Sequence, residues 1–189
     1  MKWRLAAALI ATTLLVILVQ DIPLSYYIQG VQRDRIITGL ERDAFVLAGR
    51  SEEALESPTP ESIAVITEVA KRYQASSGAR VIVVDGKGIA VVTSDPDDSK
   101  IGASYLSRPE IGTALTGEIA SGTRYSQTLQ QELLYVTVPV FSGSRILGAV
   151  RLTYPAQVVD DAVAAQLRQL WVVALTTVLL AGVVGYVVA

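Results

Sequence analysis

The two ends of the chain are long apolar runs without charges, and this feature constrains the fold more than any other. Residues 5–19 read LAAALIATTLLVILV and follow Lys2, Trp3 and Arg4, and residues 170–189 read LWVVALTTVLLAGVVGYVVA. A helix of about 20 apolar residues crosses a bilayer, and interfacial tryptophan and basic side chains extend a shorter run. We therefore expect two transmembrane helices, in residues 1–20 and 170–189.

Each of these runs has a second interpretation. A basic start followed by a short apolar run is also typical of a cleaved signal peptide, but cleavage needs small residues, and Gln20-Asp21-Ile22-Pro23 follow the run. A buried core helix is the alternative for residues 170–189. The length of that run and its freedom from charge favour a membrane span.

The basic residues set the orientation that we expect. Lys2 and Arg4 precede the first run, so the positive-inside rule places the N-terminus in the cytoplasm. Residues 21–169 then form one extracytoplasmic domain, and the second span returns the chain to the cytoplasm. The expected location is the plasma membrane, as a multi-pass protein. Since no basic residue follows the second run, we interpret the end at Ala189 as a truncation.

Composition excludes several functional classes. The chain has no histidine and no cysteine, which removes imidazole catalysis, a phosphoaccepting histidine, disulfides and thiolate metal sites. Its formal net charge of −2 does not indicate a nucleic-acid partner. A serine–lysine dyad is formally possible, and an extracytoplasmic enzyme is the least favoured functional class.

Periodicity predicts the elements between the two runs. Apolar residues at helical spacing, namely Ile28, Ile36, Leu40, Ala44 and Leu47, predict a helix over residues 22–55 with one apolar stripe. Ser57-Pro58-Thr59-Pro60 ends it, and Thr59 then caps a second helix that ends near Gly78. The period then changes to about two. Strands are predicted at residues 79–84, 89–93, 122–128, 133–141 and 145–153, with a short helix at 109–116.

These elements predict an α+β domain with a five-stranded antiparallel sheet. In the fourth strand, one face carries only Leu134, Val136, Val138 and Val140, whereas the other face is mixed. The apolar face is expected to pack on the long helices. The mixed face, beneath the insertion with the short helix, is where a small ligand would bind.

Four sequence blocks carry a family likeness: ARVIVVDGKGIAVVTSD, RPEIGTALTGE, SGTRYSQTLQQELLYVTVPV and RILGAVRLTYP. They resemble the extracytoplasmic PAS-like (PDC or single-Cache) sensor domains of bacterial sensor histidine kinases, and most of all the phosphate-regulon kinase type. The likeness covers residues 78–155. It implies a PAS-like fold, a homodimer, and a HAMP linker and kinase core after the second span.

The resemblance also implies partners and cofactors. ATP and magnesium would belong to the kinase domain, which is not in this chain, and a cytoplasmic response regulator would be the partner of that kinase. The chain itself is expected to hold no cofactor and no catalytic residue. It lacks the histidine found at the binding edge of citrate- and dicarboxylate-sensing relatives, which puts citrate-type binding in doubt.

The candidate ligand-binding residues are Arg108, Arg124, Ser126 and Tyr135. Arg108 precedes the short helix, while Arg124 and Ser126 alternate along one face of the third strand with Thr128. Arginine forks bind anions, and hydroxyl groups orient a ligand. Together with Lys100 these residues could bind a small anionic or hydroxylated ligand, or a cell-envelope ligand. The structural alternative, which we favour, is that Arg108 ties the insertion to the sheet and Arg124 is a solvated strand residue.

Two further motifs have simpler explanations. Asp95, Asp97 and Asp98 carry the oxygen ligands that calcium prefers, but the glycine and glutamate of a calcium loop are missing, so a polar turn is favoured and no metal site is predicted. The sequence Asp85-Gly86-Lys87-Gly88 is a hairpin turn and not a phosphate cradle, since no helix follows it.

The function expected from the sequence is the input region of a two-component sensor histidine kinase, which detects a stimulus outside the membrane. A membrane-anchored binding or scaffold protein without signalling output is one alternative. The sensor region of a chemoreceptor or of a cyclic-dinucleotide enzyme is another, because these receptors use similar input domains.

Overall fold

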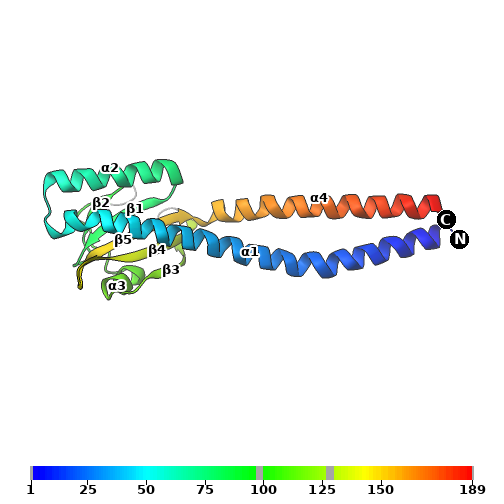
Figure 1. Ribbon diagram of the computed structural model, residues 1–189, viewed down its shortest axis with the longest axis horizontal. Helices are drawn as coiled ribbons and strands as arrows, with labels where there is room; N and C mark the ends of the chain where they lie inside the picture. Colours follow the sequence, from blue (N-terminus) through cyan, green and yellow to red (C-terminus); the bar gives the residue numbers. More distant parts are fainter. Residues whose placement is uncertain (1, 97–99, 127–129, 189) are drawn as a thin grey trace. The chain divides into compact units, whose positions relative to one another are not determined.

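The computed structural model describes residues 2–96, 100–126 and 130–188. Within these ranges the chain forms helices α1–α4 and a sheet of strands β1–β5 (Figure 1). In chain order the elements are α1 (Lys2–Glu56), α2 (Pro60–Ser77), β1 (Arg80–Asp85), β2 (Ala90–Thr93), α3 (Pro109–Leu115), β3 (Ala120–Ser126), β4 (Gln131–Ser142), β5 (Arg145–Pro155) and α4 (Ala156–Val188). They fall into two compact units, residues 35–158 and residues 1–34 with 159–189.

The strands form one antiparallel sheet in the order β2-β1-β5-β4-β3, which confirms the predicted α+β class and the five-stranded sheet. The predicted turn between β1 and β2 is present. The Asp85 carboxylate accepts hydrogen bonds from the backbone N–H groups of Lys87 (2.9 Å) and Ile89 (2.8 Å). Gly88 in that turn has a φ of +70°, which glycine adopts without strain.

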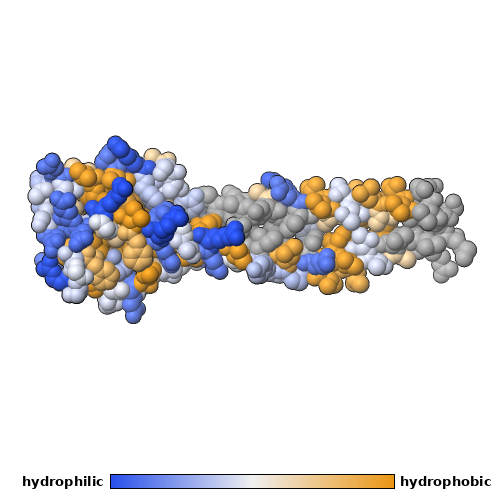
Figure 2. Space-filling view, in the orientation of Figure 1, coloured by the Kyte–Doolittle hydropathy of each residue, from blue (hydrophilic) through white to orange (hydrophobic). Residues whose placement is uncertain are grey.

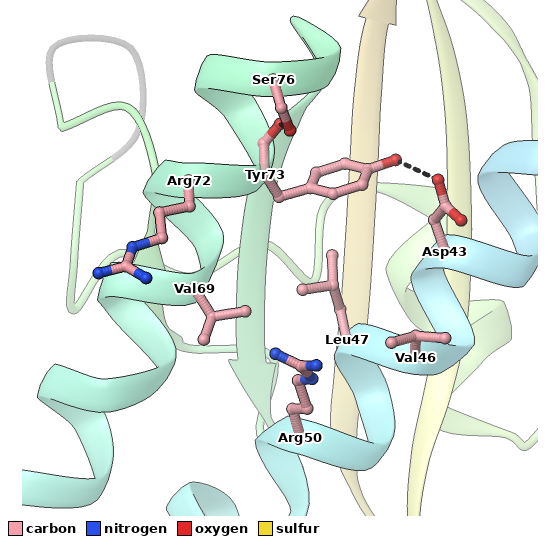
Figure 3. A pocket seen from close by; sticks show the side chains of 8 residues that line it. All are labelled: Asp43, Val46, Leu47, Arg50, Val69, Arg72, Tyr73 and Ser76. Carbon is pink, nitrogen blue, oxygen red and sulfur yellow. Dashed lines mark hydrogen bonds between the residues drawn. The ribbon is translucent and has the colours of Figure 1, made fainter.

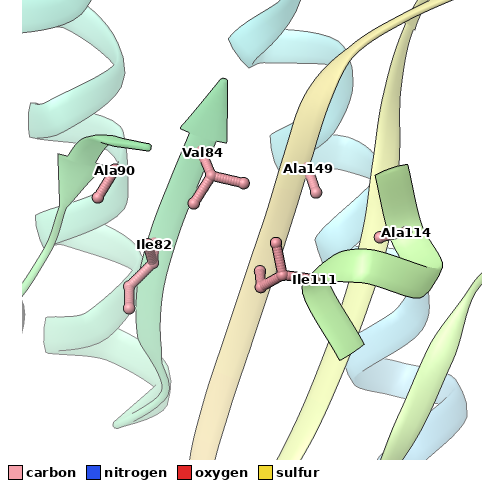
Figure 4. Packing of buried hydrophobic residues seen from close by; sticks show 6 residues of the cluster. All are labelled: Ile82, Val84, Ala90, Ile111, Ala114 and Ala149. Atoms are coloured by element: carbon pink, nitrogen blue, oxygen red, sulfur yellow. The ribbon is translucent and has the colours of Figure 1, made fainter. Parts of the chain in front are cut away.

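One face of the sheet is the apolar face predicted from β4. Leu134, Val136, Val138 and Val140 are buried on it. Helices α1 and α2 cover this face, and both lie behind the sheet when it is seen from α3 (Figure 4). Burial of such side chains stabilises a fold by about 1.5–3 kcal/mol each, so this layer is the main core of residues 35–158.

The start and end of α2 follow from local chemistry, as predicted. Thr59 is the N-cap: its hydroxyl accepts a hydrogen bond from the Ser62 backbone N–H at 3.1 Å, and the Ser62 hydroxyl accepts one from the Thr59 N–H at 3.1 Å. This reciprocal pair satisfies two backbone donors that the first turn leaves open. Gly78 ends the helix in the left-handed conformation, with a φ of +75°.

The other face of the sheet is covered by α3, which packs through Ile111 and Ala114 against Ile82, Val84 and Ala149 (Figure 4). This cluster occupies the part of the face formed by β1 and the adjoining half of β5. Toward β3 and β4 the same face carries polar side chains. The insertion therefore closes over a face that is apolar on one side and polar on the other.

Most predicted boundaries agree with the structure within two residues. The third strand was predicted at 122–128 but begins earlier, at Ala120, and its predicted end at Thr128 lies outside the described residues. The predicted helix over 22–55 is part of the longer α1. Helix α4 begins at Ala156, directly after β5, and it contains the described residues of the second apolar run.

Part of the predicted apolar stripe of α1 packs within its own domain. Leu40, Ala44 and Leu47 are buried within a single copy of the chain, with exposed fractions of 8%, 0% and 3%. These three positions therefore pack inside their own domain. The large apolar side chains that α1 leaves exposed in this region include Phe45 and Val46.

The second unit combines the N-terminal part of α1 with most of α4. A Cβ atom at Gly182 would lie 3.4 Å from Cδ1 of Ile10, so the two helical segments pack together within this unit. Many large apolar side chains on both segments are exposed, among them Leu15, Val19, Leu175 and Leu180 (Figure 2). Among the described residues, no helix meets the length and hydropathy that a membrane crossing requires.

Candidate ligand-binding site

The candidate site lies between α3 and the polar part of the sheet. Arg108 is the N-cap residue of α3 and has an extended backbone, with a φ of −93°. Pro109 follows at the first helical position, where its fixed φ suits a helix start. The next residue, Glu110, is therefore in the first turn, and it is buried together with Ile111.

Glu110 forms ion pairs with two arginines of the sheet. Its Oε1 atom lies 3.2 Å from Nη2 of Arg151 and 3.5 Å from Nε of Arg124. The side chains of Glu110 and Arg151 are only 2% and 3% exposed, and that of Arg124 is 23% exposed. Charged residues are almost never buried this deeply unless they are paired. The three side chains form a connected charged cluster, which we call the Glu110 cluster.

The sheet register explains why these residues meet. Arg151 on β5 is directly opposite Thr137 of β4 and Ile82 of β1, so all three share the face that α3 covers. Arg124 lies opposite Leu133, two residues along the same face of β4 from Tyr135. Strand alternation thus directs both guanidinium groups toward the insertion.

The charge in this region is unbalanced. Burial lowers the pKa of Arg151 to about 10, the Glu110 carboxylate opposes this shift, and the positive charges of Arg124 and Arg108 add to it. The guanidinium of Arg151 stays protonated at neutral pH. Within the described part of the chain, the side chain of Arg108 makes no ion pair or hydrogen bond. Among the described residues, the positive charges of Arg108 and Arg124 thus both act on Arg151, whose buried partner is the carboxylate of Glu110.

Some buried polar atoms of the site lack hydrogen-bond partners among the described residues. They are Oε1 of Glu110, Nε of Arg151 and Oγ1 of Thr137. The Oε1 atom of Glu110 is at ion-pair distance from both arginines but not in hydrogen-bonding geometry. Buried polar atoms are nearly always hydrogen-bonded in folded proteins. Open donors and acceptors at this position fit a site that accommodates polar atoms of water or of a small molecule.

The structure brings some of the predicted site residues together. Arg124 pairs with Glu110, which also pairs with Arg151, and the positive charge of Arg108 acts on Arg151. Tyr135 is opposite Gly122 and Thr153 on the same face, and a Cβ atom at Gly122 would lie 2.8 Å from its hydroxyl, so glycine there makes room for the phenol. Ser126 is buried at the end of β3 on that face.

Two other predicted residues are not placed in the site. Lys100 is exposed in the insertion, outside the buried Glu110 cluster. Thr128 lies outside the described residues. The interpretation of Arg124 as a solvated strand residue is wrong, because its side chain is mostly buried and paired with Glu110.

Sequence reasoning missed Glu110 and Arg151. An acidic residue in a first helical turn normally faces solvent and interacts with the helix dipole, so Glu110 gave no signal. Arg151 offered a clearer signal in the sequence. It is the only charged residue inside the run ILGAVRLTY of β5, and a single charge in a buried strand needs a partner.

The acidic loop does not show a metal site in the described residues. The carboxylate of Asp95 pairs with the guanidinium of Arg80 at 3.0 Å, which gives it a structural role at the end of β2. Asp97 and Asp98 lie outside the described residues. Among those that are described, no group of three acidic, histidine or cysteine residues could hold a metal ion.

A cavity lies between α1 and α2, and the sequence did not predict it (Figure 3). This groove has a volume of about 370 Å³ and is lined by Asp43, Val46, Leu47, Arg50, Val69, Arg72, Tyr73 and Ser76. The Tyr73 hydroxyl donates a hydrogen bond to Oδ2 of Asp43 at 3.0 Å. Burial and the neighbouring Asp43 carboxylate raise the pKa of Tyr73 to about 12. The groove is on the side of the sheet that α1 and α2 cover, whereas the Glu110 cluster is on the side that α3 covers.

Comparison with known proteins identifies the fold. No family model matches the sequence, and no curated protein matches it. The sensor domain of the histidine kinase DctB from V. cholerae is similar in structure, with a TM-score of 0.60 and 19% identity over 75% of this chain and 60% of that one. The E. coli DcuS sensor domain has a TM-score of 0.53 and 19% identity over 69% and 96%. The chain has the fold of these PDC sensor domains.

Chemoreceptors share this fold. The ligand-binding domain of Campylobacter jejuni Tlp3 in complex with L-valine has a TM-score of 0.61 and 16% identity over 82% of this chain. The present chain spans 66% of the length of that domain and 60% of the length of the DctB domain. These likenesses confirm the PDC (PAS-like) fold that the sequence predicted. They concern the fold alone, and the narrower likeness to phosphate-regulon kinases stays a prediction.

Proposed function

We propose that this chain is the sensory region of a bacterial membrane receptor and that its PDC domain binds a small anion beneath α3. The observation that carries this proposal is the excess of positive charge among the described residues of this region. The positive charges of Arg108 and Arg124 both act on Arg151, and Arg124 and Arg151 both pair with the buried carboxylate of Glu110. Charges interact more strongly in a partly buried site than in water, so an anion of matching size would be attracted.

The residue types indicate the class of ligand. A guanidinium group binds a carboxylate or phosphate through two parallel hydrogen bonds, and the half-buried Tyr135 supplies a hydroxyl on the same face. The Tlp3 domain binds L-valine, which carries a carboxylate. A small molecule with one acidic group is therefore the ligand that we propose.

The proposal extends to the rest of the receptor. The two apolar ends would anchor the domain as transmembrane helices, with residues 21–169 outside the plasma membrane. DctB is a histidine kinase with this fold in its sensor domain, and Tlp3 is a chemoreceptor with this fold in its ligand-binding domain. A kinase output with ATP, magnesium and a response regulator is therefore proposed, and a chemoreceptor or cyclic-dinucleotide enzyme is the alternative. A homodimer and kinship with the phosphate-regulon kinases belong to the same proposal.

Ligand-dependent stabilisation tests the proposed binding site. The full chain in a mild detergent would be heated with monocarboxylates, amino acids and phosphate, each compared with chloride at equal ionic strength. A ligand at about 100 times its Kd raises the free energy of unfolding by about 2.7 kcal/mol, a shift of several degrees in Tm. Arg108→Ala and Arg124→Ala should each remove this shift.

Arg72→Ala is the matched control. Its side chain is 79% exposed and pairs with Glu68 on α2, on the opposite side of the sheet. The control variant should keep the full ligand-induced shift. If a stabilising anion binds all three variants as it binds the wild-type chain, the site is not beneath α3. If no anion of these classes stabilises the wild-type chain, the binding or scaffold protein without a small ligand becomes the better interpretation.

A further inference from the structure

Glu110 is an unusual residue for the position that it occupies. It lies in the first turn of a short surface helix, yet its side chain is 2% exposed and directed at the sheet. Removing a carboxylate from water costs several kcal/mol unless a cation compensates it. The compensation here comes from Arg151 of the central strand β5 and from Arg124 of the edge strand β3.

The carboxylate of Glu110 lies inside the candidate site. It lies between the insertion and the sheet, at ion-pair distance from two guanidinium groups, and it is enclosed from solvent. Its fit is incomplete. At 3.2 Å and 3.5 Å the contacts are long for charge-assisted hydrogen bonds, and Nε of Arg151 has no hydrogen-bond partner among the described residues.

We propose that Glu110 is an internal ligand of the sensor site: its carboxylate occupies Arg151 in place of an external carboxylate, and it thereby holds α3 closed on the sheet. An external anion then reaches only the outer part of the site, at Arg108 and Arg124. Glu110 is thus the residue that sets specificity, because it denies the deep position to a second acidic group. The binding of an external anion at Arg108 and Arg124 rests on the proposed function, whereas the pairing of Glu110 with Arg151 does not.

The first consequence is that removing the side chain should create a binding site for a free carboxylate. Glu110→Ala leaves the buried guanidinium of Arg151 without its anion beside a cavity of carboxylate size. Loss of one partner of a buried ion pair is strongly destabilising, so the Tm of the full chain should fall by about 10 °C in chloride. Formate or acetate at tens of millimolar should restore most of this loss, and chloride at equal ionic strength should not.

Matched variants separate rescue at Arg151 from general salt effects. Glu110→Gln fills the same space with a neutral carboxamide, so carboxylates should not rescue it. In the double variant Glu110→Ala with Arg151→Met the buried charge is gone, and acetate should have no effect beyond that of chloride. If Glu110→Ala does not fold in chloride, the yield of folded protein after refolding in acetate and in chloride measures the same rescue.

Arg108 distinguishes the deep position from the outer one. Acetate should still rescue Glu110→Ala when Arg108→Ala is also present, because the deep position uses Arg151. The internal-ligand proposal is overturned if acetate stabilises Glu110→Ala no more than the wild-type chain, or if the Arg151→Met double variant is rescued equally well. If acetate no longer rescues Glu110→Ala when Arg108→Ala is added, the site has one shared anion position, and the proposed division into a deep and an outer position is overturned.

The outcome is independent of whether the domain senses an anion. Rescue of Glu110→Ala, together with a wild-type chain that no anion stabilises, would support the internal ligand and contradict the proposed function. An anion that stabilises the wild-type chain through Arg108 and Arg124, together with an unrescued Glu110→Ala, would give the opposite result.

Discussion

Single side chains make the stability of residues 35–158 depend on pH, and Tyr73 is an example. Its hydroxyl donates to Asp43, and its pKa is raised from 10.0 to about 12. The folded state favours the protonated phenol, so this stabilisation is fully present below about pH 10 and is lost as the pH rises toward 12. Tyr73→Phe should remove this dependence.

The measurement is the difference in unfolding free energy between wild type and Tyr73→Phe, from urea titrations at about pH 9 and about pH 11. Other groups titrate in this range, including Arg151, but they contribute equally to both proteins and cancel. The wild-type advantage should be smaller at the higher pH. Tyr125→Phe, which removes the hydroxyl of a ring residue that is 54% exposed, serves as the control. An advantage that does not change with pH would contradict the assignment.

The residue scale also shows what the sequence could reveal about the site. Arg108, Arg124, Ser126 and Tyr135 have side chains that suit anions. In the structure, Arg124, Ser126 and Tyr135 share the face of the sheet that α3 covers, and Arg108 is the N-cap of α3. Glu110 was not predicted. Its role depends on a contact between residues 41 positions apart, Glu110 and Arg151, and no local pattern encodes such a contact.

At the scale of elements, the pairing of β1 with β5 depends on Gly148. A Cβ atom there would collide with the backbone oxygen of Val84 and would lie 3.0 Å from Cδ1 of Leu55. Neither the strand nor the packed helix can move without loss of contacts, so Gly148→Ala should lower the free energy of unfolding by about 3 kcal/mol.

The same substitution at Gly49 should raise the free energy of unfolding. Gly49 lies in α1, and a Cβ atom there meets nothing within 4 Å. Alanine is about 1 kcal/mol better than glycine inside a helix. Urea unfolding of both variants measures the contrast, and a Gly148→Ala variant as stable as Gly49→Ala would show that β1 and β5 are not packed as closely as described.

Most elements could be predicted because their signals are local. Thr59, Pro60 and Gly78 determine where α2 begins and ends through caps and backbone geometry, and the Asp85 turn determines one hairpin. The use of the α1 stripe could not be predicted. An apolar stripe indicates only that a helix packs against some apolar surface. Whether Leu40 and Leu47 pack against a second chain or against their own sheet depends on the tertiary structure.

At the scale of the whole molecule, residues 35–158 and the helical unit have different surfaces. The first has a buried core and a charged cluster, whereas the second exposes large apolar side chains on both of its segments. Exposed apolar surface of this kind is typical of segments that contact another apolar phase or a partner. The proposed anchoring in a membrane would cover it.

Cysteine labelling tests this arrangement in cells. The chain has no native cysteine, so each introduced thiol reports on one position. Lys87 and Ser144 are exposed in the turns after β1 and β4, where a cysteine should not disturb packing. In intact cells, both should react with a membrane-impermeant maleimide if residues 21–169 lie outside.

The control for this experiment is a cysteine at Lys2, which precedes the first apolar run. The positive-inside rule places it in the cytoplasm, so it should react only after lysis. Labelling of all three positions in intact cells would indicate that the first run does not hold Lys2 inside, as after export without an anchor. Labelling of Lys2 alone would invert the topology, and the Glu110 cluster would then face the cytoplasm and its metabolites. Protection of all three until lysis would remove the extracytoplasmic stimulus from the proposed function, because an anion outside the cell could not reach Arg108.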